Sequence, residues 1–120
     1  MLKVPDEGKE VNMRSLEKVV SWLEGREASY YFDENGGIKA KVLLRDGERL
    51  VRVVRGWKGN MVGRVKGTSK IVVFPEIFND LQEGQVLACK LIEKESYYIG
   101  IPLSIQNSPP DVNIFWIERP

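Results

Sequence analysis

The spacing of hydrophobic and polar residues changes once along the chain, from a helical period to a strand-like one. The first apolar stripe predicts one amphipathic helix from Asn12 to Glu24, with Asn12 as its cap and Gly25 beyond its end. We expect this helix to pack on the rest of the chain, with Trp22 in the core. The polar segment 1–11 before it predicts a flexible arm.

After the helix, short apolar runs alternate with turn residues and predict seven or eight short strands. Residues 33–37 and the Asp46-Gly47 pair are strong turn signals, and further turns are expected at 58–60 and 66–68. Pro75 can open a helical turn between two strands. The runs that predict strands are ASYYF, IKAKVLLR, ERLVRVVRGW, IVVF, QVLACKLIE, YYIGIPL and VNIFWI.

These elements predict an α+β fold that is mostly antiparallel β. Many short strands in a chain of 120 residues favour a small barrel or a strongly curved sheet, because closure removes exposed strand edges. We therefore expect residues 12–120 to form a single globular domain. In this domain the N-terminal amphipathic helix packs on a small barrel or curved sheet of seven to eight strands.

The Asp46-Gly47 turn also predicts a β-hairpin with one basic face. A two-residue turn pairs Lys41 with Arg52 and places Lys39 opposite Val54, while the other face of the hairpin is apolar. Like charges directly opposite each other destabilise a hairpin by up to about 1 kcal/mol. The pairing therefore indicates that an anion lies between the two strands.

The distribution of charge points to the same kind of partner. The whole chain has 18 Lys and Arg against 17 Asp and Glu, a net charge of +1. However, the segment from Lys39 to Lys70 carries a net charge of +8 and the remainder carries −7. Such an excess of cations in one segment is typical of proteins that bind a polyanion.

The residues after the hairpin add features of nucleic-acid recognition. In RGWKGNMVGRVKGTSK, glycines allow close approach to phosphates, cations neutralise them, and Trp57 either stacks on a base or packs at the core edge. The sequence thus predicts a small, non-enzymatic domain that binds DNA or RNA mainly through backbone phosphates. The predicted site comprises Lys39, Lys41, Arg52, Arg55, Trp57, Lys58, Arg64, Lys66 and Lys70.

Several kinds of chemistry are absent from the composition. With no histidine and one cysteine, the chain cannot form a Cys/His zinc cluster, a histidine-based catalytic pair or an intramolecular disulfide. Cys89 lies in an apolar run, which predicts a buried thiol. A metal-dependent nuclease would need an acid two residues before a lysine on the strand after Asp33, and this strand reads Ile38-Lys39-Ala40-Lys41. We expect no catalytic residue, metal or cofactor, with a metal-dependent nuclease as a minor alternative.

No apolar run is long enough to span a bilayer, and the polar N-terminus lacks the apolar core of a secretory signal. We therefore expect a cytoplasmic protein with no membrane partner.

One segment carries a family pattern: glycine, strand, proline, helical turn, leucine, acid-glycine, strand. The matching residues are Gly67, Ile71, Val73, Pro75, Ile77, Leu81, Glu83, Gly84 and Val86. Over about residues 65–91 the chain thus resembles the AbrB-like swapped-hairpin family of transcription regulators. The resemblance implies a DNA-binding, often dimeric, β-rich fold in which basic strand residues touch DNA.

The C-terminal run gives the alternative function. Phe115 and Trp116 are consecutive, so a strand cannot bury both on one face. The alternative is a β-rich protein-interaction module or regulatory subunit that does not bind nucleic acid. Its protein partner, or a second copy of the chain, would be bound through Ile114, Phe115 and Trp116.

Overall fold

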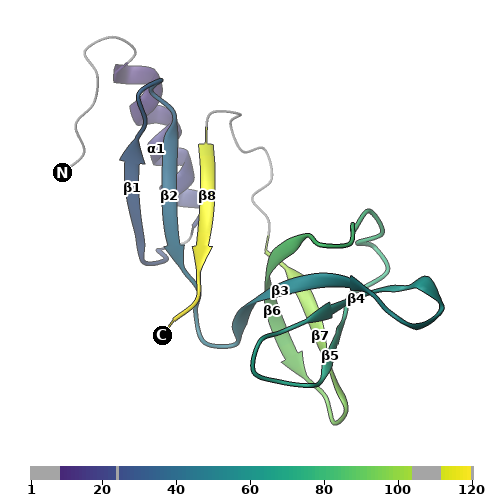
Figure 1. Ribbon diagram of the computed structural model, residues 1–120. Helices are drawn as coiled ribbons and strands as arrows, with labels where there is room; N and C mark the ends of the chain where they lie inside the picture. The colour runs from purple at the N-terminus through teal and green to yellow at the C-terminus, as the bar shows by residue number, and fades with distance from the viewer. Residues whose placement is uncertain (1–8, 24, 104–111, 120) are drawn as a thin grey trace. The chain divides into compact units, whose positions relative to one another are not determined.

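The computed structural model describes residues 9–23, 25–103 and 112–119, which divide into two compact units (Figure 1). The first, here called the sheet unit, contains the described residues up to 43 and those from 112 onward. The second, here called the barrel unit, contains residues 44–103. In sequence, the barrel unit is thus inserted between two strands of the sheet unit.

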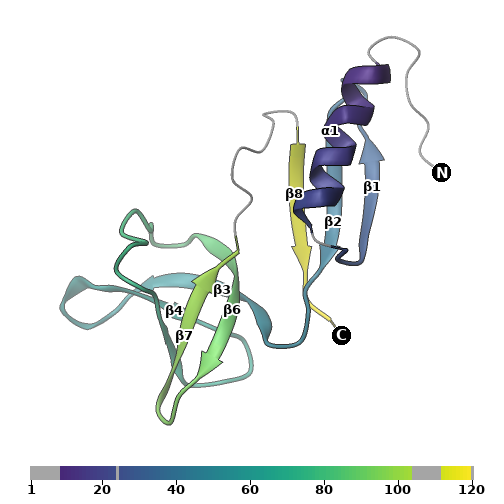
Figure 2. The ribbon, with the colours of Figure 1, turned by 180° about the vertical axis from the view of Figure 1, so that it is seen from behind.

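The sheet unit is a three-stranded sheet with one helix on one of its faces (Figures 1 and 2). The central strand pairs antiparallel with the first strand and parallel with the last. Its elements are α1 (Lys9–Trp22), β1 (Ala28–Phe32), β2 (Ile38–Leu43) and β8 (Val112–Ile117). The core between helix and sheet is formed by Val19, Leu23, Ala40 and Val42, with Trp22, Tyr30, Ile114 and Trp116 packed around them.

The turn between β1 and β2 is held by Asp33. Its Oδ1 accepts hydrogen bonds from the backbone N–H groups of Asn35 and Gly37, at 2.9 and 2.7 Å. Gly36 adopts a φ of +81°, which side chains disfavour. The predicted turn at 33–37 is confirmed, and its aspartate has a structural role.

The barrel unit is a closed five-stranded barrel with the strand order β3-β4-β5-β7-β6. Neighbouring strands are antiparallel except β5 and β7, and β6 closes the barrel by pairing with β3. The strands are β3 (Glu48–Arg55), β4 (Met61–Arg64), β5 (Ile71–Val73), β6 (Val86–Glu93) and β7 (Tyr97–Pro102). Instead of a helical turn, Pro75 begins a single turn in which the Phe78 N–H donates to the Pro75 carbonyl oxygen, at 3.0 Å.

The barrel interior is filled by small and branched side chains. Val51, Val53, Val72 and Cys89 are fully buried there. Gly63 also faces inward, where a Cβ atom would overlap the side chain of Val51 and lie 2.9 Å from the Cβ of Val72. Glycine is therefore required at this position by close packing.

The predicted fold class is wrong. We expected one α+β domain with the helix on a small barrel or curved sheet of seven to eight strands. The eight strands instead divide between the sheet and the closed barrel, and α1 packs on the sheet. Local patterns identify strands but do not specify which distant strands pair, and β2 pairs with β8 from the far end of the sequence.

The predicted hairpin at Asp46-Gly47 is also wrong, although the turn itself forms. The Glu48 N–H donates to the Arg45 carbonyl oxygen at 3.0 Å, and the Glu48 carboxylate accepts the Arg45 N–H at 2.7 Å. However, β2 pairs with β1 and β8, whereas β3 pairs with β4 and β6. The turn therefore connects two separate sheets, and Lys41 does not face Arg52.

The helix begins three residues earlier than predicted. It starts at Lys9, so Asn12 lies inside it and is not its cap. Residues 1–8 of the predicted arm, and Glu24, lie outside the described residues. Within the described part of the chain, no helix is long and apolar enough to cross a membrane.

Candidate nucleic-acid interface

Two arginines lie directly opposite each other on the outside of the barrel. Arg52 on β3 pairs with Arg64 on β4, and both side chains are exposed. The next pair along the strands, Val53 and Gly63, is buried and faces the interior. Because paired residues share one face and faces alternate along a strand, both guanidinium groups emerge on the outer face. We call Arg52 and Arg64 the arginine pair.

The arginine pair keeps its positive charge. The Nη1 group of Arg64 donates a hydrogen bond to the carbonyl oxygen of Ser69, at 3.0 Å, and this bond orients the guanidinium group without neutralising it. Among the described residues, no carboxylate lies within 4 Å of Arg52 or Arg64. The pair is therefore available to an anion from outside.

The loop between β3 and β4 presents an aromatic ring beside a further cation. Hydrogen bonds from the Gly56 N–H to the Asn60 carbonyl (2.6 Å) and from the Gly59 N–H to the Gly56 carbonyl (3.1 Å) tighten this loop. The Trp57 side chain is 85% exposed, and the Lys58 Nζ lies 4.7 Å from the centre of its ring. Trp57 therefore does not pack at the core edge, which was one of the two alternatives for it.

Lys58 adopts an unusual backbone conformation. Its φ is +62°, in the left-handed region, which costs a residue other than glycine about 1 kcal/mol or more. The residue lies in the short 3-10 turn η1 (Trp57–Gly59), at the tip of the β3–β4 connection. Residues in such conformations are enriched at binding sites, so this strain is consistent with a role for the loop.

The other predicted barrel cations are differently placed. The Arg55 Nε lies 3.7 Å from the Glu83 Oε2. Because both side chains are well exposed, this ion pair contributes little to stability. Lys70 is held by its own unit: its Nζ donates to Glu93 at 3.2 Å and to the Lys94 carbonyl at 3.1 Å. Lys66 is exposed in the turn after β4. Lys70 is thus the predicted contact least available to a ligand.

Lys39 and Lys41 belong to the other unit. They lie on β2 in the sheet unit, where Lys39 pairs with Tyr31 and Lys41 pairs with Phe115. The nine predicted site residues therefore divide between the two units, with seven on the barrel. The barrel brings Arg52 and Arg64 together and places Trp57 and Lys58 in the loop that joins their strands.

Sequence reasoning did not assign Tyr31 to any site, and it assigned Phe115 only to the alternative protein-binding surface. Tyr31 is 46% exposed and Phe115 is 50% exposed, on strands that flank β2. Side chains alternate between the two faces of a strand, so the patterns of ASYYF and VNIFWI could have indicated that Tyr31 and Phe115 point away from the core. Their position beside the lysines depends on the parallel pairing of β2 and β8, which no local pattern specifies.

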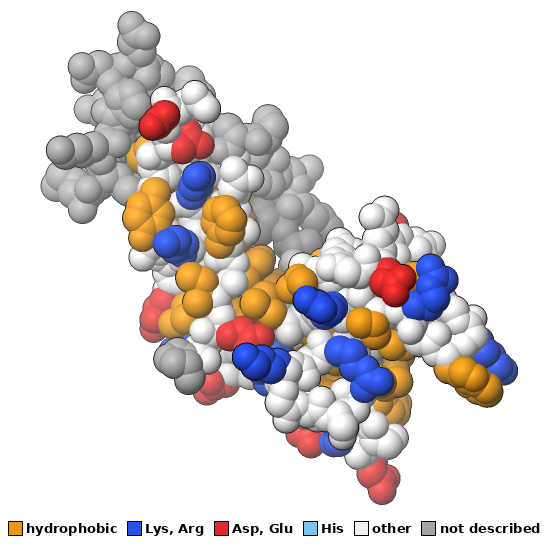
Figure 3. Space-filling model, in the orientation of Figure 1, with side chains coloured by type: hydrophobic (Ala, Val, Ile, Leu, Met, Phe, Trp, Pro, Cys, Tyr) orange, Lys and Arg blue, Asp and Glu red, His pale blue; other side chains and the backbone are white. Residues whose placement is uncertain are grey.

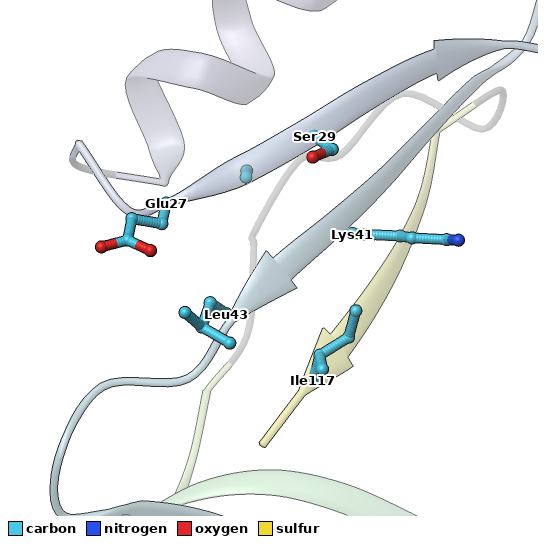
Figure 4. Close-up of a pocket in the computed structure, with 6 residues that line it drawn as sticks. Glu27, Ser29, Lys41, Leu43 and Ile117 are labelled. Carbon is cyan, nitrogen blue, oxygen red and sulfur yellow. The ribbon is translucent and has the colours of Figure 1, made fainter. Parts of the chain in front are cut away.

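A shallow pocket of about 490 Å³ lies on the sheet unit near the end of β2 (Figure 4). Figure 4 shows the Lys41 and Ile117 side chains among those that line this pocket. The Glu27 carboxylate lies 3.8 Å from the Nη2 of Arg119. The lining residues are Glu27, Ala28, Ser29, Lys41, Leu43 and Ile117. The pocket is mixed in polarity and contains one acid and one base.

The described residues contain no cluster of metal-ligating side chains. Within 9–23, 25–103 and 112–119, no group of three or more His, Cys, Asp or Glu side chains could hold a metal ion. The single thiol, Cys89, is fully buried as predicted, and desolvation raises its pKa to about 12. Burial also raises the pKa of Tyr30, which faces α1.

Comparisons with known proteins identify no relative: no protein-family model, no curated protein and no solved structure matches this chain. The resemblance of residues 65–91 to the AbrB-like family therefore stays a prediction.

Proposed function

We propose that this protein is a small, non-enzymatic nucleic-acid-binding protein whose barrel contacts backbone phosphates through β3 and β4. The observation that carries this proposal is the arginine pair, Arg52 opposite Arg64, with no carboxylate of the described chain close to either. Like charges directly opposite each other destabilise a sheet by a few tenths of a kcal/mol up to about 1 kcal/mol. A phosphate between the two side chains removes this repulsion.

Arginine suits this role because its planar guanidinium group donates two parallel hydrogen bonds to phosphate oxygens. In Arg64, one nitrogen is already bonded to the Ser69 carbonyl, which limits the motion of the side chain and leaves other N–H groups for a ligand. A partly oriented guanidinium group loses less entropy on binding.

Trp57 and Lys58 lie in the loop that joins β3 to β4, the two strands that carry the arginine pair. An indole ring that is 85% exposed offers a face on which a base can stack, and base–aromatic stacking contributes about 1–3 kcal/mol per base. Lys58, next to the ring, supplies a charge for the adjoining phosphate. Arg55 and Lys66 add exposed charge to the same unit.

The topology of the barrel supports the proposal by analogy. The order β3-β4-β5-β7-β6, with β5 and β7 parallel, is that of the OB-fold, a five-stranded Greek-key barrel. Such barrels bind oligonucleotides on the face of their second and third strands and with the loop between the first two. Here Arg64 lies on the second strand and Trp57 lies in that loop. Because fold alone does not determine function, the side chains carry the argument.

One observation favours the second candidate, a β-rich protein-interaction module. The outer face of β5, β6 and β7 carries a strip of apolar side chains: Val73 and Ile92 are exposed, and both pair with Ile99, which is half-buried. Exposed apolar strips are typical of protein contacts. Of the three C-terminal residues proposed for this role, Ile114 and Trp116 pack in the sheet-unit core and only Phe115 is well exposed.

The test is a titration of labelled single-stranded DNA, duplex DNA and RNA with the full chain at low salt, followed by fluorescence anisotropy. We expect binding, and we expect Arg52→Gln with Arg64→Gln to weaken it about tenfold or more, as for hydrogen bonds to charged groups. The control variant, Lys90→Gln with Lys94→Gln, removes the same charge from exposed positions elsewhere on the barrel. If no probe binds at low salt, the proposal is wrong and the interaction module is favoured.

A further inference from the structure

The face of the sheet unit opposite α1 carries two aromatic rings on either side of two lysines. Tyr31 on β1 pairs with Lys39, and Phe115 on β8 pairs with Lys41. These residues alternate with the buried positions Ala40 and Val42 and their partners, which face the helix. In Figure 3, basic side chains lie between hydrophobic ones on this part of the molecule.

Both rings are available for contact. Tyr31 is 46% exposed and Phe115 is 50% exposed, whereas Ala40 and Val42 on the other face are fully buried. The two rings flank β2 from opposite sides, two strand spacings apart across the sheet and two residues apart along it, so their positions are separated by about 12 Å. They can therefore contact two different groups of one extended ligand.

The lysines between the rings form no ion pair with the described acids. The Nζ of Lys41 lies 5.4 Å from the centre of the Tyr31 ring, and among the described residues no carboxylate lies within 4 Å of Lys39 or Lys41. Two acids at the ends of β1 are already engaged: Asp33 accepts backbone N–H groups of its own turn, and Glu27 lies 3.8 Å from Arg119. The face is therefore positive as well as aromatic.

We propose that this face of the sheet unit binds unpaired nucleotides of a single-stranded nucleic acid. Tyr31 and Phe115 stack on bases, and Lys39 and Lys41 contact the phosphates that join them. The inference rests on the proposed function but assigns a second site, on a different unit from the arginine pair. It also assigns a substrate class, because the base faces of a duplex are covered by their neighbours and cannot stack on a protein ring.

A protein occupant fits this face less well. The centres of protein interfaces are depleted in lysine, because its strongly hydrated charge is costly to bury. Here the lysines lie on the central strand, between the rings, where a protein partner would have to cover them. A phosphodiester chain instead places an anion between successive bases, which matches the alternation of ring and cation on this face.

The test uses the full chain and two labelled probes, a mixed-sequence single-stranded DNA and a blunt duplex. In Tyr31→Leu with Phe115→Leu the side chains stay apolar but lose their rings. We expect this variant to bind the single strand at least about fivefold more weakly for each ring lost, and to bind the duplex as the wild type does. The matched control, Tyr31→Phe with Phe115→Tyr, keeps both rings and should bind both probes normally.

A second measurement does not depend on the aromatic positions. Lys39→Gln with Lys41→Gln should lower the slope of log K against log salt for the single strand by about 1.4, because two phosphate contacts are lost. An unchanged single-strand affinity in the leucine variant would overturn the inference and favour a protein occupant, while the proposed function stands on the arginine pair. An equal loss for both probes would also overturn it. If the wild type binds neither probe, the proposed function fails, and this site fails with it.

Discussion

Cys89 shows how one buried side chain ties the sequence to the stability of the barrel. It lies in an apolar run, which predicts burial, and the structure confirms a fully buried thiol inside the barrel. Because burial disfavours the thiolate, the pKa of Cys89 rises to about 12. In the unfolded chain the ordinary thiol pKa is about 8.5.

This difference in the pKa of Cys89 between the folded and unfolded states predicts how the free energy of unfolding changes with pH. The folded state has the higher pKa, so the contribution of Cys89 to stability is fully present below about pH 8.5 and is lost as the pH rises toward 12. We expect the free energy of unfolding, measured in urea, to fall between pH 8 and pH 10 by roughly 1–2 kcal/mol more in the wild type than in Cys89→Ala. The two proteins differ in no other titratable group, so the difference between them reports Cys89. Equal pH dependence would contradict the burial of the thiol.

Among the elements, the sequence predicts strands far better than it predicts their partners. The runs at 28–32, 86–93 and 112–117 form strands as predicted, and β4 falls between the two predicted turns at 58–60 and 66–68. The Asp46-Gly47 turn also forms, yet it connects two sheets. A turn signal describes four residues, whereas pairing depends on contacts between segments far apart in sequence, such as β2 with β8.

The same limit applies to the candidate site. The cations and Trp57 could be predicted from the local composition of the sequence. Trp57 is exposed, as stacking on a base requires. The arginine pair could not be found, because it depends on the register of β3 against β4. The face with Tyr31 and Phe115 was missed for the same reason, since it needs β1 and β8 on either side of β2.

Barrel closure predicts a strict size limit at Gly63. A methyl group there would overlap Val51 and crowd Val72 and Phe74, so we expect Gly63→Ala to lower the free energy of unfolding by about 1–3 kcal/mol, as in other overpacked cores. The control is Gly67→Ala, where a Cβ atom meets nothing within 4 Å and the only cost is a φ of +92°. Urea unfolding measures both. A Gly63→Ala variant as stable as the wild type would contradict the interior position of this glycine.

At the scale of the whole molecule, the near-neutral net charge divides unevenly between the units. Residues 44–104 contain ten cations and seven acids, so the barrel segment carries +3 and the rest of the chain carries −2. The +8 of the segment from Lys39 to Lys70 is thus shared between β2 and the barrel. Each unit presents its own basic surface, and the two proposed sites can be tested separately.

The most direct test of the barrel site is the salt dependence of duplex binding. Each phosphate contact contributes about 0.9 to the slope of log K against log salt, so loss of two contacts should reduce the slope by about 1.8. We predict this reduction for Arg52→Gln with Arg64→Gln, and an unchanged slope for Lys90→Gln with Lys94→Gln, which removes the same charge. Equal slopes in the two variants would show that the arginine pair contributes only general charge, and would contradict a phosphate site on β3 and β4.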